Sequence, residues 1–244
     1  MPCSFEKHFK KYCQMMNDYS KLLNYYKACF GFIDCFHFNS ETAQNVYFEN
    51  LGYVSGKVIP ITHCGIKDNR HKKKFETSIL RIGFIGNDTP YKGLPLLLKV
   101  LKQIQNKNLW QLDIWGGKKG KEKNSLVYYR GKFDSCSVAD VYDGMDVLVV
   151  PSIWKETFGF VVLEALSYGV PVIVSDNVGA KDIIRQYDER FIFTSESELL
   201  LLLNKIIDDR SLLVNFNEKI LNGEWKHLMQ EHTEEILGLY KTIK

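Results

Sequence analysis

The strongest constraint on the fold is a regular alternation of short apolar runs with amphipathic helical stretches, which begins at residue 80. The runs rich in Val and Ile predict strands at Leu80–Ile85, Leu109–Trp115, Leu126–Tyr129, Val147–Val150, Val170–Val174 and Arg190–Phe193. Between and after them, a spacing of three and four predicts helices at Lys92–Gln105, Val138–Asp143, Phe160–Tyr168, Ala180–Gln186 and Glu196–Ile207. Alternation of this kind is typical of a parallel sheet covered by helices on both faces. We therefore predict an α/β fold with one complete doubly wound domain.

The chain before residue 80 and its last segment follow a different pattern. Apolar spacing predicts a helix over residues 5–30, a strand over 32–36, a helix over 41–50 capped by Ser40, and an extended piece over 57–61. Residues 66–79 are polar and basic and are interpreted as a linker. A long amphipathic helix over 224–243 is expected to close the chain. These features divide the sequence into an N-terminal segment, 1–65, a linker, 66–79, and the sheet domain, 80–244.

The net charge of +3 is unevenly distributed along the 244 residues. Residues 1–135 carry 22 Lys and Arg against 11 Asp and Glu, a net of +11, and the remaining 10 and 18 leave −8. A basic front half suggests a phosphate-bearing ligand or contact with an acidic membrane surface. Basic residues interleaved with aromatic ones are missing, which argues against nucleic acid. Neither a signal peptide nor a membrane span is recognisable, so a cytoplasmic protein is expected, peripheral at most to the inner face of the membrane.

Neither the cysteines nor the glycines match a metal or nucleotide motif of known spacing. The six cysteines form no Cys-x-x-Cys pair and favour buried, reduced thiols.

The first loop of the domain runs from Gly86 through Asn87 to Lys92, directly before a predicted helix. Glycine lets backbone N–H groups approach a ligand, and a helix N-terminus favours anions. Lys92 is therefore a candidate to pair with a phosphate, although its spacing is not that of a P-loop and a surface lysine at a turn would look the same.

The most informative segment is Pro151–Pro171, in which Glu156 and Glu164 lie eight residues apart around the start of a predicted helix. Free N–H groups at the start of that helix, near Phe158, Gly159, Phe160 and Val161, would face a diphosphate. The two carboxylates would accept hydrogen bonds from sugar and ribose hydroxyl groups. Anion donors beside hydroxyl acceptors predict a nucleotide-sugar site. The structural alternative is an exposed Glu156 and a locally paired Glu164.

The same segment resembles the Glu-x7-Glu signature of retaining GT-B glycosyltransferases of family 4, the group 1 glycosyltransferases. Four further stretches resemble this family in the same order: the Gly86–Gly93 loop, Leu112–Gly117, Asp146–Ser152 and Gly169–Ile184. The resemblance implies a GT-B fold with a Rossmann-like C-terminal domain that binds the nucleotide sugar. Residues 1–65 resemble only the last part of the N-terminal acceptor domain. The resemblance also implies a reaction, the transfer of a sugar from a nucleoside-diphosphate sugar to a glycan or lipid-linked acceptor. The anomeric configuration of the sugar would be retained, as in polysaccharide synthesis.

Family membership implies a role for each matched residue. Glu156 would contact the transferred sugar near its reacting centre, and Glu164 would hold the ribose hydroxyls. Lys92 would neutralise the leaving diphosphate, helped by backbone N–H groups, so that the donor needs no metal or other cofactor. The nucleotide-sugar-binding set implied by the resemblance is Glu164, Gly86, Asn87, Phe158, Gly159, Phe160, Val161, Gly131 and Lys132.

Two departures from the family leave alternatives open. Asn87 stands where the family usually has Arg, and the N-terminal segment is less than half the expected length. A partner chain or a preceding segment would then complete the cleft, or the chain is a non-catalytic nucleotide-sugar binder; a nucleotide-sugar epimerase is a third alternative. His37 and His63 lie in segments that resemble the exit strand and hinge of the acceptor domain, and the sequence favours a structural role for both.

Overall fold

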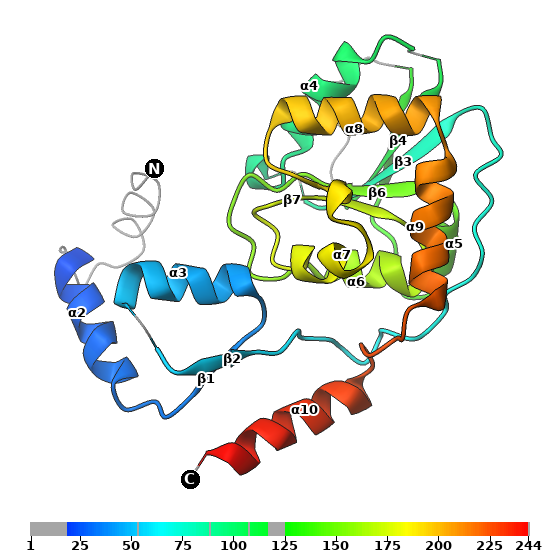
Figure 1. Cartoon of the computed structure of the whole chain (residues 1–244). Helices are drawn as coiled ribbons and strands as arrows, with labels where there is room; N and C mark the ends of the chain where they lie inside the picture. Colours follow the sequence, from blue (N-terminus) through cyan, green and yellow to red (C-terminus); the bar gives the residue numbers. More distant parts are fainter. Residues whose placement is uncertain (1–18, 53, 88, 107, 117–124, 244) are drawn as a thin grey trace.

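The computed structural model of the chain describes residues 19–243, except 53, 88, 107 and 117–124 (Figure 1). Its centre is a six-stranded sheet in the order β5-β4-β3-β6-β7-β8, in which every neighbouring pair is parallel. The strands are β3 (Leu80–Ile85), β4 (Trp110–Trp115), β5 (Val127–Gly131), β6 (Val147–Val150), β7 (Val172–Ser175) and β8 (Ile192–Phe193). The predicted doubly wound α/β fold is confirmed.

Helices cover both faces of this sheet, so its central strands are buried from solvent. Figure 1 shows α4 (Leu94–Gln103) and α8 (Glu196–Asp208) on one side, and α6 (Phe160–Ser167) and α7 (Lys181–Asp188) on the other. All four residues of β6 and all four of β7 are buried. This is why β6 and the first three residues of β7 are continuous apolar runs in the sequence rather than alternating ones. A further helix, α5 (Val138–Asp143), connects β5 to β6 and has the predicted bounds.

The order of the strands reverses between β3 and β6. From β3 the chain moves outward to β4 and β5, and it then returns to place β6 on the other side of β3, with Ile82 opposite Val147. The loops after these two strands therefore leave the same edge of the sheet side by side. Such a reversal is where open parallel sheets bind ligands.

The N-terminal part is a small unit beside the sheet domain. It contains α2 (Tyr19–Phe30), β1 (Phe36–Phe38), α3 (Glu41–Leu51) and β2 (Gly56–Val58), and β1 pairs with β2 in parallel. Ser40 caps α3 as predicted, accepting from the N–H of Ala43 at 3.0 Å. The same Ser40 hydroxyl donates to the carbonyl of Thr157 at 2.6 Å. The first unit is thus bound to the loop that follows β6.

One of the predicted elements before residue 80 differs from the structure, and another lies partly outside the described residues. The predicted strand over 32–36 is wrong, because the chain turns after α2 and the strand is Phe36–Phe38. Phe32, which made the run look apolar, is 89% exposed. Of the predicted helix over 5–30, residues 19–30 form α2, and residues 5–18 lie outside the described residues.

The predicted closing helix over 224–243 is also wrong at its start, and a helix before it was missed. The structure has α9 (Ser211–Asn222), then an extended segment, then α10 (Met229–Thr242). Arg70, from the linker, donates to the carbonyls of Ile220 and Gly223 at the end of α9, and its guanidinium lies 5.1 Å from the ring of Trp225. These contacts between distant residues end α9 and bury Trp225, which no local pattern reveals. α10 lies beside the N-terminal unit, where His232 contacts His37 at 5.9 Å between ring centroids (Figure 1).

Candidate active site

Two loops meet at the reversal of strand order. The loop after β3 leads into a short 3-10 turn, Pro90–Lys92, and the loop after β6 begins at Pro151. Gly93 has a φ of +80°, and a Cβ at this position would lie 1.7 Å from the carbonyl oxygen of Pro151. The N–H of Ile153 donates to the carbonyl of Tyr91 at 2.9 Å. Only glycine permits this close approach of the two loops, and the hydrogen bond between Ile153 and Tyr91 then holds them together.

The contact between these two loops places Lys92 next to Glu156. The ammonium Nζ donates to Oε1 of Glu156 at 2.6 Å, and the hydroxyl of Ser152 donates to Oε2 at 2.9 Å. The side chain of Lys92 is 36% exposed and that of Glu156 is 18% exposed, so a ligand can reach both. The backbone of Glu156 is fixed as well, because its N–H donates to Asn177 and its carbonyl accepts from Gly179. The structure thus brings together the two residues that the sequence proposes as catalytic.

The helix that follows, α6, points its N-terminus at this pair. Gly159 is its N-cap with a φ of +104°, and a Cβ there would come within 3.0 Å of Val178 and 3.7 Å of Oε1 of Glu156. Phe158 is buried, Phe160 is exposed, and Val161 is half-buried. The first N–H groups of a helix have no partner within it and carry partial positive charge. A diphosphate at this end of α6 would therefore meet both these groups and the Lys92 ammonium.

Glu164 lies one turn into α6, and its two oxygens are approached from different sides. The Tyr142 hydroxyl donates to Oε2 at 2.6 Å, and Nε2 of His63 lies 3.4 Å from Oε1. The ring of His63 also contacts that of Phe160, with centroids 5.1 Å apart. The Glu164 side chain is 26% exposed and remains accessible to a ligand. This places His63, for which the sequence favoured a purely structural role, among the predicted site residues.

Tyr142 is a contact that the sequence did not predict. It lies in a correctly predicted helix, α5, but its aromatic ring there is indistinguishable from any core residue. No spacing signal could have found it, because it reaches Glu164 through the packing of α5 against α6.

The remaining candidates lie at the ends of β3, β4 and β5. Gly86 donates its N–H to Trp115, and Gly116 donates to the carbonyl of Gly131 at 2.7 Å. A Cβ on Gly116 would lie 2.9 Å from the Gly86 carbonyl oxygen, so these three strand ends converge.

Two polar candidates are exposed beside these strand ends. Asn87 accepts from the hydroxyl of Thr89 at 2.6 Å, and Lys132 follows Gly131. Gly131 and Lys132 are separated from Glu156 by β4 and β3 in the sheet.

Within residues 19–243, apart from the gaps given above, no three His, Cys, Asp or Glu side chains are grouped to hold a metal ion. In the same part of the chain, no helix has both the length and the apolarity to span a membrane.

Solved structures with the same fold support this interpretation of the architecture. Sucrose-phosphate synthase from Thermosynechococcus elongatus superposes with a TM-score of 0.68 at 19% identity, covering 96% of this chain and 64% of that protein. HepE of Anabaena, solved in complex with UDP and glucose, superposes with a TM-score of 0.72 at 16% identity, covering 92% and 68%. At these identities the likeness concerns the fold, which is GT-B in the neighbours.

The family is identified by a family model, and a sequence relative is consistent with it. An uncharacterized glycosyltransferase of Methanocaldococcus jannaschii is 25% identical over 177 residues, which cover 65% of this chain and 44% of the relative. This chain therefore spans less than half the length of that curated relative. The model of the glycosyl transferases group 1 family matches residues 66–222, a range that contains Lys92, Glu156 and Glu164. The chain belongs to the glycosyl transferases group 1 family.

Proposed function

We propose that this chain carries the donor site of a glycosyltransferase that moves a sugar from a nucleoside-diphosphate sugar to a glycan or lipid-linked acceptor, with retention at the anomeric carbon. The observation that carries the proposal is the Lys92–Glu156 pair at the reversal of strand order, beside the N-terminus of α6. The resemblance to retaining enzymes supports retention. The complex of HepE with UDP and glucose makes UDP-sugars the first donors to test.

The leaving diphosphate is the group that this site suits best. In our proposal the Lys92 ammonium and the first N–H groups of α6 neutralise the charge that develops as the sugar–phosphate bond breaks. Fixed positive groups at such a position are commonly a large term in catalysis. Glu156 faces the sugar near its reacting carbon, while Glu164 accepts hydrogen bonds from the ribose. This arrangement would operate without a metal ion or other cofactor.

Thermal unfolding tests the donor site directly. UDP, GDP, ADP and their sugar conjugates would each be added to the purified chain, with and without a chelator. A ligand at a hundred times its Kd adds about 2.7 kcal/mol to the free energy of unfolding. A shift for one base that survives the chelator supports a metal-independent site. A cooperatively folded sample with no shift for any nucleotide would refute donor binding by this chain.

A non-catalytic or partner-dependent nucleotide-sugar binder is the second candidate. The observation in its favour is Asn87, an uncharged residue in the loop beside Lys92 where the family usually has Arg, so that one contact to the diphosphate would be weaker. Such a chain would bind the nucleotide sugar but would not transfer the sugar by itself. Turnover of a donor sugar by the purified chain alone would exclude this candidate.

The acceptor side is proposed to lie near an anionic membrane surface. The basis is the net charge of +11 over residues 1–135, which carry 22 Lys and Arg against 11 Asp and Glu. An acidic surface attracts such a segment with about 1 kcal/mol for each basic residue near it. Binding to vesicles that contain phosphatidylserine is expected to weaken steeply as salt increases. Binding that does not respond to salt, or no binding, would contradict the proposal.

A further inference from the structure

Tyr142 connects the core of the domain to the nucleotide side of the site. Its side chain is fully buried, and its ring stacks on that of Tyr168, with centroids 5.4 Å apart and 15° between the planes. A buried hydroxyl without a partner is costly, and Glu164 supplies the acceptor at 2.6 Å. Burial, with the Glu164 charge beside it, raises the pKa of Tyr142 well above 10. The hydroxyl therefore remains a donor under all physiological conditions.

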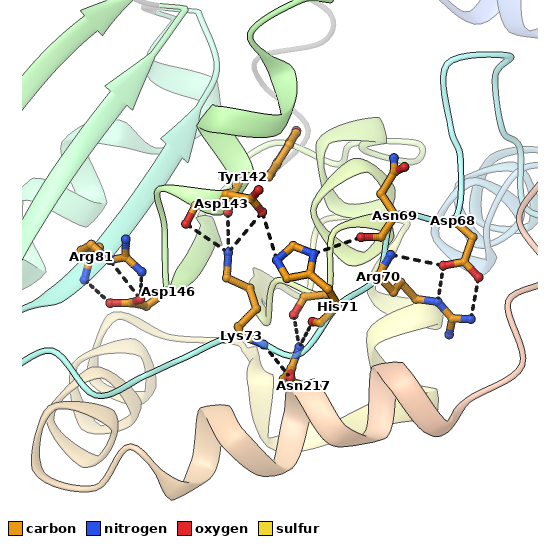
Figure 2. Close-up of polar contacts among 11 residues, drawn as sticks. Asp68, Asn69, Arg70, His71, Lys73, Arg81, Tyr142, Asp143, Asp146 and Asn217 are labelled. Atoms are coloured by element: carbon orange, nitrogen blue, oxygen red, sulfur yellow. Dashed lines mark hydrogen bonds and ion pairs between the residues drawn. The ribbon is translucent and has the colours of Figure 1, made fainter.

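The backbone of Tyr142 is held by the linker. Lys73 is 7% exposed, and its Nζ donates to the carbonyl of Tyr142 at 2.8 Å and to that of Asp143 at 3.3 Å (Figure 2). These are the last residues of α5, where the unpaired carbonyls of a helix attract a cation. Two parts of Tyr142 are thus fixed at once: its carbonyl by Lys73 and its hydroxyl by Glu164.

The linker is itself held by α9 (Ser211–Asn222). Asn217, buried in α9, accepts from the N–H of Lys73 at 3.2 Å (Figure 2). Its amide donates to the carbonyls of His71 and Gly169, at 3.2 and 2.7 Å. Both the side chain and the backbone of Lys73 are therefore held in place, the side chain by the end of α5 and the backbone by Asn217.

The other oxygen of Glu164 is left to face the ligand. Nδ1 of His63 accepts from the N–H of Gly65 at 3.1 Å, so the proton of the neutral ring is on Nε2, which lies 3.4 Å from Oε1. This distance is longer than the 2.6 Å of the Tyr142 bond, and His63 is 39% exposed. A ligand hydroxyl can compete for Oε1, whereas Oε2 is committed to Tyr142.

We propose that Tyr142 is a positioning residue for Glu164: it holds the carboxylate so that Oε1 is presented to the nucleotide, and Lys73 holds Tyr142. The inference rests on the proposed function, since it assigns Glu164 to the nucleotide. Without the Tyr142 hydroxyl the carboxylate is free to turn Oε1 away from the nucleotide, so we expect nucleotide binding to weaken about tenfold or more.

Tyr142→Phe tests this with the ring stack preserved. We expect its Kd for the nucleoside diphosphate that stabilises the wild type to rise about tenfold, with kcat at saturating donor changed less than threefold. Tyr168→Phe is the matched control, because it removes a hydroxyl from the other ring of the same stack, and its Kd is expected to stay within about twofold of the wild type.

A double-mutant cycle separates positioning from general loosening of the fold. If Tyr142 acts through Glu164, Tyr142→Phe should cause no further loss of affinity in a Glu164→Gln background. Additive losses, or a wild-type Kd in the single variant, would overturn the proposal.

A ligand-free measurement keeps the inference separate from the proposed function. In crystals without ligand, the Glu164 carboxylate should keep one rotamer in the wild type and in Tyr168→Phe, and should leave it in Tyr142→Phe. An unchanged rotamer in Tyr142→Phe overturns the positioning role even if no nucleotide binds. Failure of every nucleotide to bind the wild type, with the rotamer displaced as expected, would overturn the proposed function and leave positioning of Glu164 supported.

Discussion

The Nζ of Lys92 lies 2.6 Å from Oε1 of Glu156, although 64 residues separate them in the chain. The contact exists because β3 and β6 are neighbours in the sheet, and because Gly93 allows the loops after these strands to touch. In the ligand-free protein each residue compensates the charge of the other. A bound diphosphate would compete with Glu156 for the ammonium, and the predictions for Lys92 and Glu156 depend on that competition.

Lys92→Met is expected to weaken binding of a nucleoside diphosphate about tenfold or more, because one charge-assisted contact to the phosphates is lost. Binding of the corresponding nucleoside, which has no phosphate, should be unchanged. Lys99→Met is the control, since the Nζ of Lys99 also lies 2.6 Å from a carboxylate, that of Glu196, but on the surface between α4 and α8. Titration calorimetry measures all three proteins, and equal losses in the two variants would refute a specific role for Lys92.

Glu156→Gln should abolish sugar transfer while nucleotide binding is kept. The amide has nearly the shape of the carboxylate but not its charge, so we expect kcat to fall about a hundredfold or more, as when one transition-state contact is removed. The Kd for the nucleoside diphosphate should be unchanged or lower, because Lys92 loses its competing partner. The measurement is an assay of turnover, in which the nucleotide released from the donor sugar is quantified in the presence of acceptor. A variant that keeps its turnover would show that Glu156 has been assigned the wrong role.

Gly93→Ala is expected to destabilise the domain severely. Its φ of +80° strains any other residue, and the new Cβ would lie 1.7 Å from the Pro151 carbonyl oxygen, so the two loops must separate. Gly131→Ala is matched to it, with the same φ of +80° but nothing within 4 Å of the added Cβ. Left-handed strain alone costs about 1–2 kcal/mol. Urea unfolding should therefore show a loss of this size for Gly131→Ala and a clearly larger one for Gly93→Ala; equal losses would mean that the loops are not pinned.

Protonation of His227 should destabilise the protein in acid. Burial, with Arg70 nearby, lowers the pKa of its ring from 6.5 to about 4, while Glu231 opposes the shift. The unfolded chain therefore binds this proton first as the pH falls, and stability that is present above pH 6.5 is lost toward pH 4. A pKa lowered from 6.5 to about 4 corresponds to a loss of at most roughly 3.4 kcal/mol in the free energy of unfolding. Urea unfolding at several pH values should show a slope in this window that His227→Gln reduces; the same slope in both proteins would contradict the assignment.

The strands and helices of the sheet domain could be predicted well because the pattern of apolar and polar residues in each element reflects which of its residues are buried. β3, α5 and β6 have the predicted bounds, since their neighbours in sequence mark where burial begins and ends. The first and last parts of the chain were harder. The end of α9 and the extended segment after it are held by Arg70, which is about 150 residues away in the chain. The predicted strand over 32–36 is misplaced because Phe32 is exposed although its residue type is apolar.

By itself the sequence determined the alternation of strands and helices, the family, and the candidates Lys92, Glu156 and Glu164, because these are properties of local pattern and spacing. Only the tertiary structure decided that Lys92 is paired with Glu156, that Tyr142 binds one oxygen of Glu164, and that His63 lies 3.4 Å from the other. The physical reason is that an apolar run specifies which face of an element is buried, but not which element covers it. Strand order and helix packing make that choice, and they bring together side chains that lie 22 to 101 residues apart in the chain.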